Sequence, residues 1–586
     1  MYKNRIKQVQ NYLIKNNIDG FVFFISDDHG SEYITNTYKS VSFLSGFTGS
    51  AGTLLITKDE SFLWTDGRYF LQASEQLKLS NTTLKKIGED ESIIEYISSN
   101  LKTLALDFKV ANVSFISYLL SVCNIKLVHE EKLLNEIWTN RPKLSKKTIS
   151  VLPDNVTHMS INKKCYKTLS HIKQKDNYGV LVTALDDIAY LLNARGKDIK
   201  YNPVFNSFMF LSKVNGVNTY TLYICKSKLS LEAKDKFEKQ GIIVKPYNKI
   251  YKDVANFKHK IYYSPSKTNY LLYTLMHNKK DVELWPTLNK AIKRKEEIKD
   301  SKKAHIKDAI AMCKFIYYIK NNVGKVKMSE LSVTKHLEKL RRNQGAHDLS
   351  FSTICGYKAH GAIIHYSADK NSNVAIENDG FLLVDSGGQY YYGTTDITRT
   401  LALNNITDEM KYHFTLALKS HIDLAMAKFD KYTLDSKLDL IARKPLWDVG
   451  LDYNHGTGHG VGYLLNVHEG SNAFRWRQIK GSEPACVLEE GMVTTDEPGI
   501  YREGQYGIRT ESELLCVKGQ KNSFGQFMGF ENLTYVPIDL DALLPEQMTE
   551  MERKRLNEYH GMVYENVAPF LEQKEAEWLR NYTRAI

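Results

Sequence analysis

The sequence predicts an α/β protein with several domains, and three observations support this fold class. The chain has 586 residues, whereas one domain usually holds about 100 to 200, so its length favours three or four domains. Residues 179–193 run from an apolar strand straight into an amphipathic helix, which is typical of an α/β unit. Residues 380–384 form a second apolar run of the kind found in buried strands.

The N-terminal half begins with an amphipathic pattern at residues 6–13, which predicts a helix. An apolar strand is expected next, at residues 20–25. A polar linker near residues 138–142 ends this first unit. The second α/β unit, which contains residues 179–193, begins after Pro153.

A charged segment at residues 293–303 marks the boundary of the C-terminal half. Mixed charge of this kind is typical of a solvated helix face, and nucleic-acid binding is the minor alternative. Residues 304–318 predict the helix that opens the last domain. Residues 548–570 predict a surface helix with an amphipathic, aromatic tail.

Two aspartates mark the strand-forming region of this half. Asp385 follows the apolar residues 380–384, and a Gly-Gly pair turns the chain soon after it. Asp396 comes eleven residues later, within a Thr- and Ile-rich segment that favours extended structure. The two segments can pair as a hairpin, which would bring both carboxylates to one place. Carboxylates held this close repel each other unless a multivalent cation lies between them, so a dinuclear metal site is expected.

A glycine-rich ribbon at residues 455–462 carries two histidines, His455 and His459. Glycine removes side-chain bulk and lets the backbone approach a ligand closely. Further along, Glu497 precedes a stiff Pro-Gly turn, and Glu511 precedes an apolar segment. With the two aspartates and His459, these residues make a mostly oxygen ligand set, which suits Mn²⁺, Co²⁺ or Zn²⁺.

Each of these residues also has an ordinary structural explanation. An Asp before Gly-Gly or a Glu before Pro-Gly is most often a turn residue. A glycine-rich ribbon can be a loop with surface histidines, and a histidine in an apolar segment, such as His365, is more often structural. The order in which all of them occur along one chain favours the metal site.

The order and contexts of these residues resemble a known family, the dinuclear metallopeptidases of the pita-bread fold. The matching contexts are Val-Asp-Ser-Gly, Thr-Thr-Asp-Ile-Thr-Arg-Thr, His-Gly-Thr-Gly-His-Gly-Val-Gly, Thr-Asp-Glu-Pro-Gly and Gly-Ile-Arg-Thr-Glu. Within this family the sequence is most similar to the Xaa-Pro aminopeptidases, or aminopeptidase P. The resemblance implies that Asp385 chelates one metal ion and that His459 and Glu497 bind the other. It implies that Asp396 and Glu511 bridge both ions.

The resemblance also places three further histidines around the metal ions, as catalytic and substrate-binding residues: His365, His455 and His468. A hydroxide that bridges two divalent ions would attack the peptide bond before a penultimate proline, with Glu497 as general base. One metal ion and an imidazole would stabilise the oxyanion, and His365 or His468 would protonate the leaving nitrogen. The expected cofactor is two Mn²⁺ ions per subunit, with Co²⁺ or Zn²⁺ as alternatives.

Further matches at residues 43–53, 64–73 and 202–205 extend the resemblance over nearly the whole chain. They are typical of the three-domain, cytosolic-type members. The resemblance therefore implies two creatinase-like α/β domains, at residues 1–137 and 150–297. A pita-bread catalytic domain with a C-terminal extension would occupy residues 298–586.

Arg68 is a candidate for substrate binding, because it lies in the second of these motifs. It could be a surface arginine after an Asp-Gly turn. Alternatively, its guanidinium reaches the catalytic cleft and binds the backbone or the C-terminal side of the substrate.

Composition limits the compartment and the partners. The net charge of +12 comes from 79 Lys and Arg against 67 Asp and Glu, and no basic block of the nucleic-acid-binding type occurs. No stretch approaches the roughly 18 to 20 apolar residues of a membrane helix, and the N-terminus lacks an apolar signal core. The seven cysteines lack Cys-x-x-Cys spacing, as expected in a reducing compartment. We expect a cytoplasmic enzyme acting on peptides with penultimate proline, without nucleic-acid or membrane partners, and by resemblance a homodimer.

Two other functions stay open on the sequence. One is a prolidase-like dipeptidase that cleaves Xaa-Pro, and the other is a non-catalytic binding module of the same fold. The retained ligands and histidines argue against the module. Thr510 and Ser512 depart from the family pattern beside Glu511, and the interval around residues 475–478 is a few residues longer. Both departures could change hydrogen bonding to Glu511 and the shape of the cleft.

Overall fold

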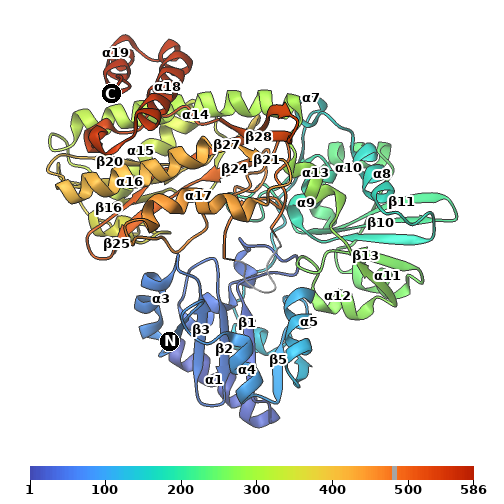
Figure 1. The fold of residues 1–586 in the computed structure, drawn as a ribbon. Helices are drawn as coiled ribbons and strands as arrows, with labels where there is room; N and C mark the ends of the chain where they lie inside the picture. Colours follow the sequence, from blue (N-terminus) through green and yellow to red (C-terminus); the bar gives the residue numbers. More distant parts are fainter. Residues whose placement is uncertain (478–484) are drawn as a thin grey trace. The chain divides into compact units, whose positions relative to one another are not determined.

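The computed structural model describes residues 1–477 and 485–586, and the described chain forms two compact units. Unit 1 runs from Met1 to Leu288, and unit 2 contains the described residues from Asn289 to Ile586. Both units combine helices with strands, as Figure 1 shows. The predicted α/β class is therefore confirmed.

Unit 1 contains a first six-stranded sheet in the order β4-β3-β2-β1-β5-β6. Its strands are β1 (Gly20–Phe24), β2 (Thr53–Thr57), β3 (Ser61–Thr65), β4 (Thr83–Lys86), β5 (Thr103–Leu106) and β6 (Lys126–His129). Its helices are α1 (Tyr2–Asn16), α2 (Ser40–Ser45), α3 (Phe70–Gln76), α4 (Ile93–Asn100), α5 (Val113–Val122) and α6 (Leu133–Ile137). The helix and the strand expected at residues 6–13 and 20–25 are both present.

Helices cover both faces of this first sheet, because alternate residues of a strand point to opposite sides. Phe21 and Phe23 of β1 pack in the cluster that includes α1, α2 and α3. Val22, between them, packs in the cluster that includes α4 and α5. The sheet is therefore buried on both sides, as its apolar strands predict.

A second six-stranded sheet of unit 1 has the order β12-β11-β10-β8-β13-β14. The strands of this region are β7 (Ser150–Val151), β8 (Tyr178–Val182), β9 (Ala194–Arg195), β10 (Ser207–Val214), β11 (Val217–Ile224), β12 (Ile242–Lys245), β13 (Lys260–Tyr263) and β14 (Asn278–Asp281). Its helices are α7 (Asp154–Thr157), α8 (Ile161–His171), α9 (Leu185–Leu191), α10 (Leu231–Lys239), α11 (Lys249–Asn256), α12 (Tyr270–Leu275) and α13 (Trp285–Ala291). The succession of β8 and α9 is the strand and helix expected at residues 179–193.

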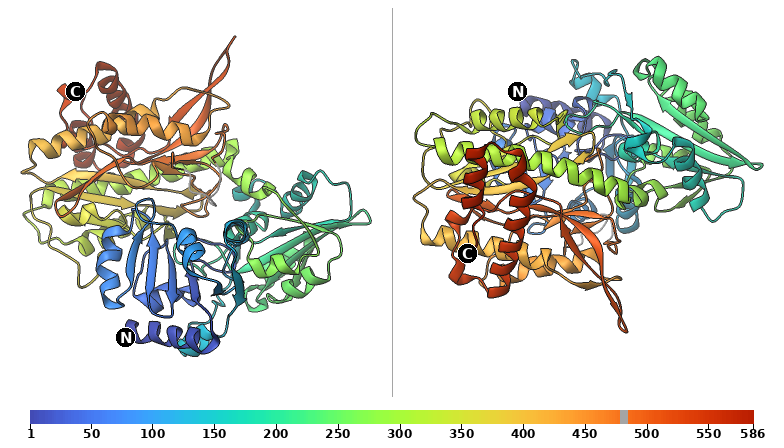
Figure 2. Two further views of the ribbon diagram at one scale, coloured as in Figure 1. Left: turned by 60° about the horizontal axis from the view of Figure 1, so that its bottom comes forward. Right: turned by 90° about the horizontal axis from the view of Figure 1, so that it is seen from above.

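Unit 2 contains three small antiparallel sheets, in the orders β16-β17-β20, β15-β18-β19 and β21-β28-β27-β24. Their strands are β15 (Asp348–Leu349), β16 (Ile354–Tyr357), β17 (Phe381–Ser386), β18 (Gly388–Tyr390), β19 (Gly393–Thr394), β20 (Ile397–Ala402), β21 (Phe429–Asp430), β24 (Val493–Asp496), β27 (Ser512–Asn522) and β28 (Gly525–Asn532). Two strand pairs complete the unit: β22 (Gly458–His459) with β23 (Ala473–Phe474), and β25 (Gly499–Arg502) with β26 (Tyr506–Arg509). The β27–β28 hairpin forms the projecting arm in Figure 2.

The helices of unit 2 are α14 (Lys295–Asn322), α15 (Glu330–Asn343), α16 (Asp408–Ala425), α17 (Asp435–Trp447), α18 (Glu550–Val567) and α19 (Gln573–Tyr582). Leu382 and Val384 of β17 pack in the cluster that includes α14, whereas Phe381 packs in the cluster that includes α16. β17 is therefore buried on both faces and gives Asp385 a rigid support.

The helix expected at residues 548–570 is present as α18, and the C-terminal segment continues beyond it. It forms α18 and α19, which both contact α14 (Figure 2). Val563, Leu579 and Tyr582 are buried in the core cluster of α14. The second helix escaped notice because its apolar residues are few and widely spaced.

The charged segment at residues 293–303 has the solvated helix face that its composition predicts, with Lys295, Lys299 and Lys303 exposed, but its other face is buried. Most of it is the first part of α14, and Lys293, Glu297 and Asp300 are buried. Burial lowers the pKa of Lys293, and the negative charges of Glu469, Glu297 and Glu513 raise it. Opposite charges therefore compensate each other in this buried region. Among the described helices, none combines the length and the apolar character that a membrane crossing needs.

Candidate metal centre

Two groups of His and carboxylate side chains in the described chain have donor atoms that lie within 4.8 Å of one another. One group, in unit 2, is Asp396, His459 and Glu511. The other, in unit 1, is Asp107, His129 and Glu131. Only the first contains residues that the sequence singled out.

The pairing of β17 with β20 brings Asp385 and Asp396 together. The two strands are antiparallel, and Asp385 at the end of β17 lies opposite Thr398. Asp396 stands one residue before β20, so it emerges at the same end. The pairing expected from the sequence is confirmed, with the short hairpin of β18 and β19 inserted between the two strands.

The glycine-rich ribbon brings His459 to the same place. His459 lies in β22, and its backbone N–H donates to Thr495 Oγ1 at 3.0 Å. The backbone N–H of Glu497 donates to the Thr457 carbonyl at 2.7 Å, which ties the Pro-Gly turn to the ribbon. His459 Nε2 consequently lies 3.5 Å from Asp396 Oδ2 and 3.6 Å from Glu497 Oε1.

The glycines of the ribbon also allow close packing within the chain. A Cβ at Gly458 would overlap the carbonyl oxygen of Thr495, and a Cβ at Gly460 would overlap that of Glu469. The close neighbours of these two positions are backbone atoms of this same chain. Glycine is needed because the ribbon packs against two other segments.

Glu511 lies between β26 and β27 and is buried. Its backbone N–H donates to the Thr398 carbonyl at 3.1 Å, and the Thr398 hydroxyl donates to Glu511 Oε2 at 2.7 Å. The residues around it hold β20 against β27. Ser512 departs from the family pattern and receives a hydrogen bond of 3.5 Å from Arg399 Nη2. The longer interval at residues 475–478 cannot be followed to its end, because Gln478 lies outside the described residues.

The carboxylates of this site destabilise one another as anions. Burial raises the pKa of Asp396 well above its usual range, and Asp385 and Glu513 raise it further. Burial also raises the pKa of Glu511 well above its usual range, and the charges of Asp396 and Glu497 raise it further. Burial raises the pKa of Glu497 to about 7. A site of this kind is stable with ionised carboxylates only when added positive charge compensates them.

The donor atoms fit a pair of divalent cations. Asp385 Oδ1 is buried and has no hydrogen-bond partner among the described residues, so this oxygen is available to bind a metal ion. The remaining donors are carboxylate oxygens and the His459 imidazole, which suit Mn²⁺, Co²⁺ or Zn²⁺. Asp385, Asp396, His459, Glu497 and Glu511 could therefore hold the ions.

The three additional histidines lie at different distances from this centre. The His468 ring lies beside the His459 ring, with centroids 4.1 Å apart. His455 is linked to the centre through Tyr501, whose hydroxyl lies 2.9 Å from His455 Nε2. His365 belongs to the segment after β16, and the preceding carbonyl of Ile364 lies 3.5 Å from Arg509 Nη2.

Arg509, Tyr501 and Glu513 are residues of this site that the sequence interpretation missed. Arg509 Nη2 donates to Asp385 Oδ2 at 2.6 Å, and Arg509 Nη1 donates to the Tyr501 hydroxyl at 2.8 Å. Glu513 Oε1 accepts the Asp396 N–H at 2.7 Å. Arg509, Glu511 and Glu513 alternate along an extended segment, so they share one face. The alternation of these three charged residues is visible in the sequence, whereas no sequence feature indicates a role for Tyr501.

Arg68 lies in unit 1, just after β3. Its Nε and Nη2 donate to the two carboxylate oxygens of Asp66, both at 2.8 Å, and its Nη1 lies 3.6 Å from Glu32 Oε1. Its side chain is 20% exposed. The guanidinium is therefore held within unit 1 by local carboxylates.

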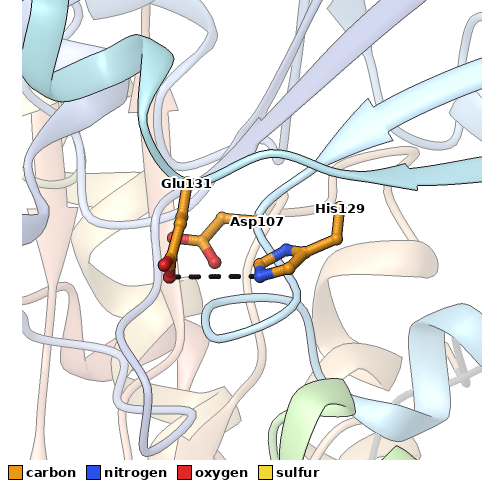
Figure 3. Close-up of side chains that lie close together, drawn as sticks. All are labelled: Asp107, His129 and Glu131. Carbon is orange, nitrogen blue, oxygen red and sulfur yellow. Dashed lines mark ion pairs between the residues drawn. The ribbon is translucent and has the colours of Figure 1, made fainter.

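The cluster in unit 1 is not suited to a metal ion, although its side chains converge (Figure 3). The Phe108 N–H donates to His129 Nδ1 at 3.1 Å, so the neutral ring carries its proton on Nε2, the atom that faces Glu131. Lys109 Nζ lies 2.5 Å from Glu131 Oε2, and the Lys109 N–H donates to Asp107 Oδ1. An ion pair and local hydrogen bonds account for this cluster.

Comparison with known families assigns the parts of the chain. Residues 299–518 match the model for metallopeptidase family M24, and residues 526–586 match the C-terminal region of peptidase M24. Residues 5–137 and 140–297 each match a creatinase/prolidase N-terminal domain. The matches together cover nearly the whole chain.

Full-length relatives agree with these matches. The chain is 33% identical to aminopeptidase P1 of Arabidopsis thaliana over 97% of each chain. It is 34% identical to Xaa-Pro aminopeptidase 1 of Dictyostelium discoideum, over 99% of this chain and 96% of the relative. A solved structure from Caenorhabditis elegans, described as a cytosolic X-prolyl aminopeptidase with a di-nuclear active site, superposes with a TM-score of 0.94. It is 30% identical in sequence and covers 100% of both chains.

Proposed function

Because the chain belongs to the Xaa-Pro aminopeptidases of metallopeptidase family M24, we propose that it removes the N-terminal residue from peptides with proline in second position. The observation that carries this proposal is the convergence of Asp396, His459 and Glu511, with Glu497 and Asp385 beside them. A family relative that serves only as a binding module would not need to keep such a ligand set.

Two divalent ions held by the five ligands would supply activation of a water molecule and positive charge opposite the tetrahedral oxygen. The residues of the chain do the rest. Glu497 would accept the proton of the attacking water, because it is a carboxylate at the edge of the site, 3.6 Å from His459. His365 or His468 would donate a proton to the proline nitrogen as it leaves.

His455 would orient the substrate. Its Nε2 is hydrogen-bonded to the Tyr501 hydroxyl, and Tyr501 is in turn held by Arg509. His455 Nδ1 lies 2.7 Å from the Gly456 carbonyl, so a ring fixed at both nitrogens keeps a constant orientation beside a bound peptide. We also propose that Arg68 contacts the substrate, although its bonds to Asp66 are all within unit 1.

The finer features of the enzyme are part of the proposal. Mn²⁺ is our choice among the metals that suit this donor set, with Co²⁺ and Zn²⁺ as alternatives. The proposed location is the cytoplasm, and neither nucleic acid nor a membrane is a proposed partner. The domain boundaries at residues 1–137, 150–297 and 298–586 can be tested by limited proteolysis.

A homodimer is the proposed assembly. Trp447 and Trp476 are 41% and 36% exposed, and their ring centroids are 5.5 Å apart. Two exposed tryptophan rings in contact are a candidate for part of a protein contact. Sedimentation velocity of the metal-loaded protein would give the mass directly, and a monomer at all concentrations would refute the assembly.

The activity is tested with three substrates and one variant. Metal-stripped protein is supplied with Mn²⁺ and incubated with a peptide beginning Arg-Pro-Pro, an Xaa-Pro dipeptide and a Met-Ala peptide, and the products are identified by mass. We expect release of the N-terminal Arg from the first peptide, and no release by the Asp396→Ala variant. Cleavage of the dipeptide alone would favour the prolidase-like alternative, and no cleavage with any metal would favour the binding module.

A further inference from the structure

Glu330, the first residue of α15, is a buried carboxylate that four hydrogen-bond donors surround. Its Oε1 accepts the Tyr357 N–H at 2.9 Å and His360 Nδ1 at 2.8 Å. Its Oε2 accepts the Tyr366 hydroxyl at 2.9 Å and the Val374 N–H at 3.4 Å. An ionised carboxylate offers only acceptors, so it matches this environment, and a side chain with N–H groups does not.

All four donors lie on one segment, residues 357–374, which carries His365. Tyr366 is the next residue after His365, and its ring stacks on the His360 ring with centroids 4.4 Å apart. The Glu330 side chain therefore fixes two rings on either side of His365 in the sequence. Its oxygens act as the internal support of a segment that is otherwise without long regular structure.

The start of α15 also closes the far end of this segment. The Glu330 N–H donates to the Val374 carbonyl at 3.3 Å, and the Leu331 N–H donates to Asn373 Oδ1 at 2.9 Å. The Ile376 N–H donates to the Met328 carbonyl at 3.0 Å. The segment is thus attached to α15 at several points along its length, and Glu330 lies among them.

The segment also contacts Arg509, which is hydrogen-bonded to the candidate ligand Asp385. The Ile364 carbonyl lies 3.5 Å from Arg509 Nη2, the same atom that donates to Asp385 at 2.6 Å. Gly361 lies so close to Gly507 that a Cβ at Gly507 would overlap the Gly361 carbonyl oxygen. In the sequence His365 lies between Ile364, whose carbonyl meets Arg509, and Tyr366, whose hydroxyl donates to Glu330.

We propose that Glu330 is a positioning residue for His365. Its side-chain hydrogen bonds within the described chain go to none of the five candidate ligands, and it acts by holding Tyr366 and His360 so that the His365 ring keeps one direction relative to the metal centre. This inference rests on the proposed function, in which His365 transfers a proton or binds the substrate. Misplacement of a reacting group by about 1 Å can reduce a rate by about 100-fold, so the effect is measurable.

The test is a double-mutant cycle on the Mn²⁺-loaded full chain, with the peptide beginning Arg-Pro-Pro as substrate. Glu330→Gln keeps the size of the side chain, but its amide NH₂ group is itself a donor and cannot accept a hydrogen bond from the surrounding donors. We expect kcat to fall about 10- to 100-fold with little change in KM, metal content or melting temperature. Glu338→Gln, in the same helix but 35% exposed, is the matched control and should leave kcat unchanged.

The decisive comparison is with His365→Ala. If Glu330 acts through His365, the double variant Glu330→Gln/His365→Ala is no slower than His365→Ala alone. Additive losses, or equal losses of metal and activity, would show a structural role only and overturn the inference. Tyr366→Phe removes one hydroxyl and no charge, so it repeats the cycle if Glu330→Gln does not fold. A wild-type protein without any cleavage would instead overturn the proposed function together with this inference.

Discussion

Arg509 and Asp385 form a buried ion pair at the edge of the metal centre, with 2.6 Å between Arg509 Nη2 and Asp385 Oδ2. The second Nη atom of the same guanidinium donates to Tyr501, which lies 2.9 Å from His455. One planar side chain therefore connects a candidate metal ligand, Asp385, to His455 through Tyr501. This connection has consequences that experiments can separate.

Replacement of Arg509 by Lys should weaken both metal binding and catalysis. Lysine keeps the charge but cannot donate to Asp385 and Tyr501 in the fixed directions of a guanidinium. Loss of a residue that orients a metal ligand reduces affinity or activity by about 10- to 100-fold. Metal titration by calorimetry and peptide cleavage would measure both effects. Arg502→Lys, at a side chain that is 42% exposed on β25, is the control and should change neither.

Replacement of Tyr501 by Phe should separate the effect on His455 from the effect on metal binding. Phe keeps the ring in place and removes the hydroxyl that joins His455 to Arg509. Because no metal ligand is touched, we expect an unchanged metal affinity and a kcat/KM reduced about tenfold or more. Tyr432→Phe, at a 70% exposed ring, provides the comparison. A loss of metal equal to that of Arg509→Lys would contradict this division of roles.

The metal-free protein should become less stable as the pH rises, and bound metal ions should oppose this loss of stability. Burial raises the pKa of Glu497 from its ordinary 4.5 to about 7, and burial raises those of Asp396 and Glu511 well above their usual range. Between pH 4.5 and 7 the native metal-free protein thus binds more protons than the unfolded chain, so its stability falls as the pH rises. Divalent ions replace these protons, and metal binding should release protons.

Differential scanning fluorimetry of chelated and Mn²⁺-loaded protein tests this prediction. The chelated protein should melt at a lower temperature at neutral pH than at pH 5.5, and the gain in melting temperature from Mn²⁺ should increase over that range. The metal-free double variant Asp396→Asn/Glu511→Gln should lose most of this dependence, because two of the three groups no longer titrate. A gain from Mn²⁺ that is larger at low pH would be incompatible with the raised pKa values.

Gly507→Ala should damage the site from a position outside it. A Cβ there would overlap the backbone of Gly361, so the segment that carries His365 would have to move. We expect a lower melting temperature and a lower kcat, measured by fluorimetry and peptide cleavage. Gly561→Ala is the matched control, because nothing lies within 4 Å of its added Cβ in α18. That change should raise the free energy of unfolding by about 0.5 to 1 kcal/mol, since alanine is the better helix residue.

Much of the fold and of the site could be predicted from short segments. The β8–α9 unit, the first helix and strand, and the pairing that joins Asp385 to Asp396 each depend on local apolar patterns, which the sequence carries. For residues 293–303 the prediction holds for the exposed face of the helix and misses the buried one. Their mixed charge resembles a solvated face, and nothing local reveals that Glu469 and Glu513, far along the chain, compensate Lys293.

The sequence by itself determined the fold class and the identity of the candidate ligands, because residue types and their order suffice for both. Only the tertiary structure decided which residues support them. Arg509, Tyr501 and Glu330 act through contacts with segments distant in sequence, such as the 2.8 Å bond from His360 to Glu330. Such contacts depend on how strands and loops pack, since a buried charge finds its partner in space rather than along the chain.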